Sequence, residues 1–321
     1  LAMFFFAVGD AFRTGTHKAM IFEWLRLENR LDERTRVYGF TRSWSKFGSA
    51  ISALVAAALV MISGSFSIIF WLSVVPYVLN LVNFLGYPNS LEGVHEAEPS
   101  LSEAVRLTGR ALKESVTKSR LRRLLIESMM MEGGFKVTAG YLQPVLKTLA
   151  LGLPILTLGL APDQRSALII GVVYSFYFLV MGFASQRAHR WAEKLGGEEQ
   201  LTRLIWGWNF VVFLLMGLTM LAGMPVLVVV AFIALGMIQN TFRPAQITRF
   251  NRESSPEMGA TILSVESQSN SLAAAAMAPP LGWMVDRGVQ AAELNVAGFW
   301  PVAALGAAIS AMVLVFRLAR K

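Results

Sequence analysis

The sequence contains no cysteine and only three histidines, so it offers few ligands for metal or thiol chemistry. The missing cysteine excludes disulfide bonds and thiolate metal sites, and His17, His95 and His189 lie too far apart to indicate a metal cluster. The chain also lacks a Gly-x-Ser-x-Gly motif and a phosphate-binding glycine loop. These absences disfavour a membrane enzyme, so we predict a protein that is not an enzyme and carries no cofactor.

Charge is also scarce, while apolar sequence is abundant. Asp, Glu, Lys and Arg make up 16% of the 321 residues and hydrophobic residues 55%, whereas about 25% of a soluble domain is charged. A membrane-spanning helix needs about 20 mostly apolar residues. The blocks that meet this test, some with embedded charge, are Ala2–Leu25, Phe47–Leu91 (two spans, broken at Gly64-Ser65-Phe66-Ser67), Leu124–Leu146, Ser166–Gln186, Ile205–Gly223, Pro225–Phe242, Met258–Val285 and Val296–Phe316. We therefore predict an all-α protein with nine transmembrane helices in a lipid bilayer.

The formal net charge of +8 follows a pattern along the chain. In a soluble protein it would suggest a nucleic-acid partner, but here Lys and Arg gather in every second gap between the apolar blocks. This alternation is what the positive-inside rule requires. It predicts a multi-pass protein of the cytoplasmic (inner) membrane, with the C-terminus in the cytoplasm and no nucleic-acid partner.

The longest polar gap, 92–123, has its own pattern. Ser100-Leu101-Ser102-Glu103 has the form of a helix-capping box, and apolar residues then recur at helical spacing. We expect a basic amphipathic helix. It lies either on the cytoplasmic face of the membrane or in solvent as a linker helix, and the sequence leaves both open.

Two local motifs point to a known family. Residues 182–190 read Gly-Phe-Ala-Ser-Gln-Arg-Ala-His-Arg, and their glycine and two arginines match the Gly-x-x-x-Asp-Arg-x-Gly-Arg loop of the major facilitator superfamily. Gln186 replaces the Asp and His189 the second Gly. The stretch Pro279–Arg287 is also similar to the family. Together with the long cytoplasmic gap, these features make essentially the whole chain resemble that superfamily.

The resemblance implies a domain organisation. The family has twelve helices in two six-helix halves joined by a long cytoplasmic loop. Residues 1–91 would then be the remainder of the N-terminal half-bundle with three helices, 92–123 the cytoplasmic linker, and 124–321 the C-terminal six-helix half-bundle. The chain would hold family helices four to twelve, and we expect an N-terminal portion to be missing.

Charged residues inside spans cost about 2.5–3.5 kcal/mol on insertion scales, so we expect them to face a cavity or a partner. In the resembling family the first, fourth, seventh and tenth helices line the central cavity. The residues predicted to form a substrate or proton pathway are Asp10, Arg13, His17, Glu132, Lys136, Asn240, Arg243 and Glu266. Asp10 and Arg13 could instead form a structural ion pair, and Glu132 could pair with Lys136 rather than carry a proton.

A second group is predicted to serve as gate contacts or structural pairs. Its members are Glu23, Arg42, Lys46, Arg187, Arg190, Asp286 and Arg287. Glu23 and Arg42 fall at similar depth in the first two spans, so we expect that they could pair with each other.

The function implied is that of a secondary active transporter, for example a symporter, that moves a small hydrophilic solute by alternating access with proton coupling. A carboxylate such as Glu132 or Asp10, desolvated in the cavity, could load and release a proton. The embedded basic residues hint at an anionic solute, although embedded acids nearly balance them. Two alternatives remain: a drug or lipid exporter of the same fold, which should have a more apolar cavity, and a non-transporting sensor or scaffold, which should lack the embedded carboxylates.

Overall fold

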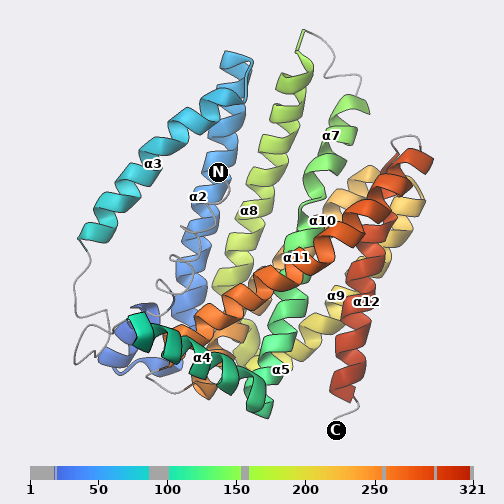
Figure 1. Cartoon of the computed structure of the whole chain (residues 1–321). Helices are drawn as coiled ribbons and strands as arrows, with labels where there is room; N and C mark the ends of the chain where they lie inside the picture. The colour runs from blue at the N-terminus through green and yellow to red at the C-terminus, as the bar shows by residue number, and fades with distance from the viewer. Residues whose placement is uncertain are drawn as a thin grey trace.

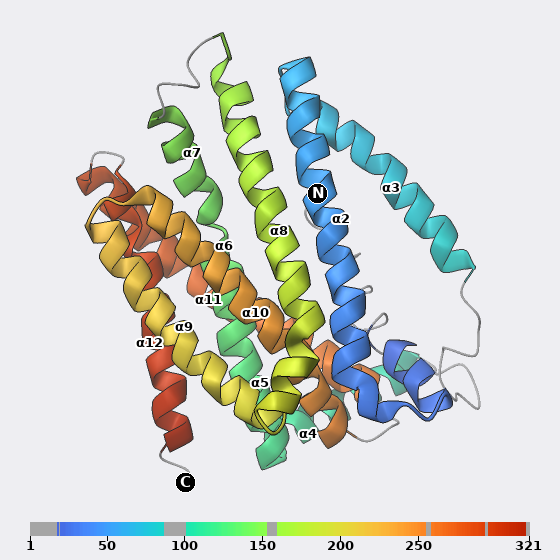
Figure 2. The ribbon, with the colours of Figure 1, turned by 180° about the vertical axis from the view of Figure 1, so that it is seen from behind.

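The computed structural model describes residues 18, 20–86, 101–152, 159–254, 258–292 and 295–318, and the regular structure within them is helical. Figures 1 and 2 show a bundle of long helices, with α4 lying across one end. After a helix at residues 20–27, the elements in chain order are η1 (Leu31–Glu33), α2 (Arg34–Ser63), α3 (Ser67–Leu85), α4 (Leu101–Thr117), α5 (Ser119–Ser128), η3 (Met129–Gly133), α6 (Gly134–Ala139), α7 (Leu142–Gly152), α8 (Pro162–Lys194), α9 (Glu198–Leu221), α10 (Pro225–Glu253), α11 (Gly259–Ala291), η5 (Val296–Phe299) and α12 (Trp300–Leu318).

Six helices of the described residues are long and apolar enough to cross a membrane. They are Leu31–Ser63, Ser67–Leu85, Pro162–Lys194, Glu198–Leu221, Pro225–Glu253 and Val296–Arg317. Of the other three predicted spans, the first lies mostly outside the described residues, the one from Leu124 is divided into several helices, and the one from Met258 is the continuous helix α11. The all-α membrane fold is therefore confirmed, and the count of nine stays a prediction.

The break predicted inside Phe47–Leu91 is confirmed at Gly64. This residue has φ +69°, and its N–H donates to the Val60 carbonyl oxygen at 2.8 Å. A left-handed residue at this place ends a helix, and glycine adopts it without steric cost. The chain can therefore turn and begin α3 at Ser67.

Several helices extend beyond the apolar blocks that predicted them. α8 continues past Gln186 to Lys194, and α10 continues past Phe242 to Glu253. Residues 182–190 therefore belong to a helix and not to a loop, and Asp286 and Arg287 likewise lie within α11. Hydropathy marks only the part of a helix inside the bilayer, whereas Arg, Glu, Gln and Lys continue a helix readily in water.

The span predicted from Leu124 to Leu146 is interrupted twice. The first interruption is η3, a π-helical turn that contains Glu132. The second lies between α6 and α7, at Gly140 and Tyr141. Pro144 explains the second, because a proline ring clashes with the carbonyl four residues earlier, which here is that of Gly140.

Helices α2 and α8 lie side by side over most of their length (Figures 1 and 2). Small residues allow this close approach. A Cβ at Gly39 of α2 would lie 2.5 Å from the backbone oxygen of Ser185, and one at Gly171 of α8 would lie 2.4 Å from Cβ of Ala57. The approach is thus fixed at two levels, and it joins the N-terminal part of the chain to the C-terminal part.

Helix α4 is the amphipathic helix predicted in the long polar gap. Ala111 and Ser115 are buried, and the helix packs against α11 and α5. Val105, Leu112 and Val116 are exposed. One face thus packs on the bundle, and contact of the other face with the membrane stays a prediction.

Candidate functional site

A buried ion pair lies between α10 and α11. Arg243 donates from Nη1 to Glu266 Oε1 and from Nη2 to Glu266 Oε2, the second at 3.0 Å. Both residues are buried, with 5% and 0% of their surface exposed. Ser128 also donates to Glu266 Oε1, and Asn270 Nδ2 donates to the same atom at 2.6 Å. The Glu266 carboxylate is therefore fully occupied by protein donors.

Glu132 lies next to this pair but has a different environment. It is buried, and its two carboxylate oxygens accept from Nε2 of Gln239 at 2.9 and 2.8 Å. The nearest guanidinium atom in an ion pair with it is Nε of Arg243, at 4.0 Å. Since Arg243 is already paired with Glu266, the hydrogen-bond partner of Glu132 is a neutral amide. We call Ser128, Glu132, Gln239, Asn240, Arg243, Glu266 and Asn270 the central cluster.

Three cations border the central cluster, and we call Lys18, Arg42 and Lys46 the basic rim. Arg42 of α2 donates to Asn240 Oδ1 at 3.1 Å and to Gln239 Oε1 at 3.3 Å. Lys18 Nζ lies 3.7 Å from Glu266 Oε2, and Lys46 Nζ lies 5.3 Å from the centre of the Phe178 ring. All three are partly exposed. The basic rim therefore joins buried polar groups to accessible space.

A second ionic network, which we call the end network, joins four helices near the end of the bundle that carries α4 (Figure 1). Glu127 of α5 accepts from Arg249 Nη1 at 2.8 Å and from Arg317 Nη2 at 2.5 Å. Arg249 Nη2 also donates to Glu199 of α9 at 2.5 Å. Glu127 is 3% exposed and Arg249 6% exposed. The network thus ties α5, α9, α10 and α12 together.

The structure brings together four residues of the predicted pathway: Glu132, Asn240, Arg243 and Glu266. Lys136 is not among them. Its Nζ donates to Ser271 Oγ at 3.1 Å, and its side chain is exposed. The alternative pair between Glu132 and Lys136 is therefore wrong, because Glu132 contacts Gln239 of α10 while Lys136 contacts Ser271 of α11.

The expected pairing of Glu23 with Arg42 is also wrong. Glu23 accepts from Arg26 at 2.9 and 2.5 Å, within a single turn of its own helix. Arg42 instead reaches α10. The prediction used depth along the chain from the cytoplasmic ends, and depth does not say which way each helix face points.

Four other predicted residues that the structure describes lie away from the central cluster. Arg187 and Arg190 are exposed at one end of α8, and Asp286 is exposed near the end of α11. Arg287 lies 4.0 Å above the Trp283 ring. Asp10, Arg13 and His17 fall outside the described residues. A gate or pairing role for these positions stays a prediction.

Sequence reasoning left out Gln239, Ser128 and the end network. Gln239 could have been recognised from the sequence, since it lies one turn before Arg243 on the same face of α10. Arg249 continues the same polar face. The sequence did not indicate that Arg317 pairs with Glu127, because the positive-inside rule already expects a basic residue after the last span.

Comparison with known proteins adds one match. A search of curated proteins found no match. The family model described as the Major Facilitator Superfamily matches residues 1–267, which extends from the first residue into α11 and includes most of the central cluster and its basic rim. A match over most of the chain, on an all-helical membrane fold, shows that this protein belongs to the Major Facilitator Superfamily.

Proposed function

We propose that this membrane transporter moves a small hydrophilic solute with an anionic group by alternating access, and that its transport is coupled to proton binding at Glu132. Family membership supports transport itself. The solute class, the coupling ion and the transport cycle are inferred from the central cluster and the contacts between α2 and the C-terminal helices.

The observation that carries the proposal is the unequal environment of two buried carboxylates. Glu266 is neutralised by a bidentate arginine and accepts from Ser128 and Asn270 as well. Glu132 is held by the Gln239 amide, with Arg243 no closer than 4.0 Å. A buried carboxylate without a dedicated cation is the group that gains most from taking up a proton. Glu132 is therefore the proton carrier in this proposal, and Glu266 is a fixed structural charge.

An anionic solute follows from the charge around the cluster. Among the described residues, the four cations Lys18, Arg42, Lys46 and Arg243 outnumber the two carboxylates of the central cluster, Glu132 and Glu266. Among the described residues, the hydrogen bonds of Arg42 go to the amide oxygens of Asn240 and Gln239. A guanidinium with neutral partners is free to exchange them for a carboxylate or phosphate, which it binds in a bidentate manner.

Alternating access requires contacts that can break, and α2 makes such contacts at one end. The Thr35 hydroxyl donates to Glu198 Oε1 at 2.9 Å and lies 2.7 Å from Thr248 Oγ1. Arg34 Nε donates to Asn251 Oδ1 at 2.5 Å. These polar contacts join α2 to α9 and α10 on the side that charge alternation assigns to the cytoplasm, and we propose that they form a closed cytoplasmic gate.

Two other functions are less well supported. A drug or lipid exporter would favour an apolar site, whereas the central cluster contains an arginine, two carboxylates and three amides. A non-transporting sensor or scaffold would have no need for Glu132 and Glu266 in the bundle, where ionisable groups are costly.

The test is solute uptake by the full-length protein in proteoliposomes, with a panel of sugars, amino acids, organic acids and apolar drugs. We expect uptake of organic acids. Arg42→Gln should raise KM for the transported acid by about tenfold or more, since a hydrogen bond to a charged group contributes roughly 1.5–3 kcal/mol. Arg203→Gln, which removes an exposed arginine of α9, is the control. Uptake of neutral drugs alone would contradict the proposal.

A further inference from the structure

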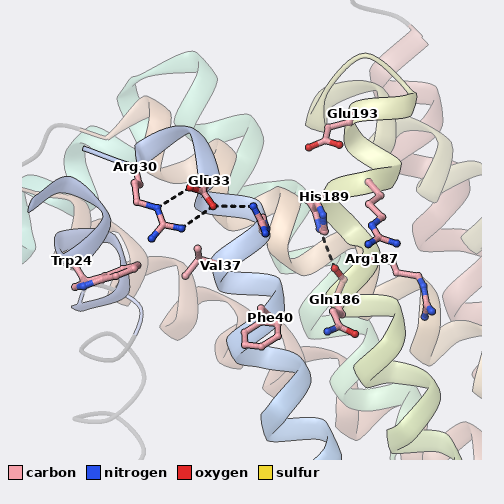
Figure 3. A pocket seen from close by; sticks show the side chains of 11 residues that line it. Trp24, Arg30, Glu33, Val37, Phe40, Gln186, Arg187, His189 and Glu193 are labelled. Atoms are coloured by element: carbon pink, nitrogen blue, oxygen red, sulfur yellow. Dashed lines mark hydrogen bonds and ion pairs between the residues drawn. The ribbon is translucent and has the colours of Figure 1, made fainter. Parts of the chain in front are cut away.

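A pocket of about 790 Å³ lies between the segment 24–40 and the end of α8 (Figure 3). Its walls combine apolar side chains (Trp24, Val37 and Phe40), basic ones (Arg30, Arg36, Arg187 and Arg190) and two carboxylates (Glu33 and Glu193), so the basic groups outnumber the acidic ones. It is separate from the central cluster, none of whose residues line it. Charge alternation assigns this end of the bundle to the cytoplasm, and the inference below depends on that orientation but not on the solute proposed above.

The basic groups of the pocket are unevenly neutralised. Glu33 accepts from Arg30 at 2.7 and 3.0 Å and from Arg36 at 3.2 Å, so its charge is shared by two arginines. On the opposite wall, Arg187 lies over the Phe183 ring at 5.3 Å. Among the described residues, neither Arg187 nor Arg190 has a carboxylate within ion-pair distance, and both are exposed. Two guanidinium groups are therefore free to bind an anion.

A row of aromatic rings leads away from Arg187 across α8 and α2. Phe183 is 5.2 Å from Phe47, Phe47 is 5.9 Å from Trp44, and Trp44 is 6.3 Å from Phe40. Trp44 is 62% exposed and Phe40 48% exposed. In a membrane protein, such exposed rings face acyl chains. The row therefore provides an apolar surface that is continuous with the basic groups.

Two tryptophans place this region at the membrane–water boundary. The Arg30 guanidinium lies 5.4 Å from the Trp24 ring centre, and Lys194 Nζ lies 5.7 Å from that of Trp191. Tryptophan is enriched at the level of lipid head groups. We therefore expect the pocket at the depth where a head group meets the start of its acyl chains.

We propose that this pocket binds one anionic phospholipid of the cytoplasmic leaflet. Arg187 and Arg190 bind the phosphate, because guanidinium groups form charge-assisted, bidentate hydrogen bonds with it. The row from Phe183 to Phe40 contacts an acyl chain. Basic pockets between transmembrane helices on the cytoplasmic side suit anionic head groups, and the adjoining aromatic surface favours a lipid over a soluble phosphate compound.

The test is native mass spectrometry of the delipidated full chain with added phosphatidylglycerol or phosphatidylcholine. We expect one phosphatidylglycerol to be retained preferentially. Arg187→Gln combined with Arg190→Gln should weaken its binding by roughly 30-fold, because each basic group near an anionic lipid contributes about a fivefold change. The charge-conserving Arg187→Lys with Arg190→Lys should bind more tightly than the double glutamine variant but less tightly than the parent, because lysine keeps the charge and loses the bidentate geometry. All variants should elute and unfold like the parent.

The matched control is Arg203→Gln combined with Arg106→Gln, which removes two exposed basic residues that charge alternation also assigns to the cytoplasm. This variant should bind the lipid as the parent does. An equal loss in test and control variants, or equal retention of the two lipids, would overturn the proposal. Competition by glycerol 3-phosphate at the same concentration as the lipid would also overturn it, by showing that the site takes a soluble anion.

Discussion

Arg243 and Glu266 form a bidentate ion pair between α10 and α11, and both residues are buried. Such a pair is costly to form, since two charges leave water, but it is more costly to break. Loss of one partner leaves the other charge buried and unpaired, at about 3–5 kcal/mol. The pair therefore fixes how the two helices face each other around Glu132.

Glu266→Gln should lower the free energy of unfolding by about 3–5 kcal/mol, because Arg243 would keep its charge and lose its bidentate carboxylate. The measurement is the thermal unfolding midpoint in detergent. Glu23→Gln is the matched control. Glu23 pairs with Arg26, whose side chain is 42% exposed, and an exposed pair contributes about 0–1 kcal/mol. Similar shifts in the two variants would contradict the structural role of the buried pair.

Gly171→Ala should weaken the contact between α2 and α8. The added Cβ would lie 2.4 Å from Ala57 Cβ, so the helices must separate, and such overpacking costs about 1–3 kcal/mol. The midpoint of thermal unfolding measures the effect. For comparison, a Cβ at Gly207 of α9 meets nothing within 4 Å, so Gly207→Ala should leave stability unchanged or raise it by up to about 1 kcal/mol. A neutral Gly171→Ala would show that α2 and α8 do not pack as described.

The absence of cysteine allows a direct test of membrane orientation. Lys194→Cys, at the end of α8, and Ala222→Cys, in the turn before α10, place one thiol on each side of the membrane. A thiol reagent that cannot cross the membrane should label Ala222→Cys in intact cells. It should label Lys194→Cys only after the membrane is permeabilised, and the unaltered chain should remain unlabelled. The reverse labelling would invert the orientation on which the gate and the lipid pocket depend.

The sequence predicted the helical class, the break at Gly64 and the presence of Glu132, Asn240, Arg243 and Glu266 in a polar site. These predictions depend on local properties, namely apolar length, a turn residue and charge inside a span. Helix ends were predicted too short, as at Gln186 where α8 continues to Lys194, because hydropathy does not detect a polar helix end.

Partner choice was predicted less well. Glu23 and Arg42 were matched by depth, yet Arg42 reaches Asn240 on α10. Such pairing depends on how each helix is rotated about its axis, which is set by packing across the whole bundle. A pair of Glu132 with Lys136 was likewise left open, yet Glu132 contacts Gln239 of α10 and Lys136 contacts Ser271 of α11.

The most direct test of the proposed function is proton flux driven by a transported organic acid in proteoliposomes, measured for the parent, Glu132→Gln and the control Glu23→Gln. Glutamine keeps the shape of Glu132 and can still bond to Gln239, but it cannot take up a proton. We predict that Glu132→Gln abolishes proton flux that depends on the solute, while Glu23→Gln retains it. Proton flux that persists unchanged in Glu132→Gln would contradict the assignment of this carboxylate as the proton carrier.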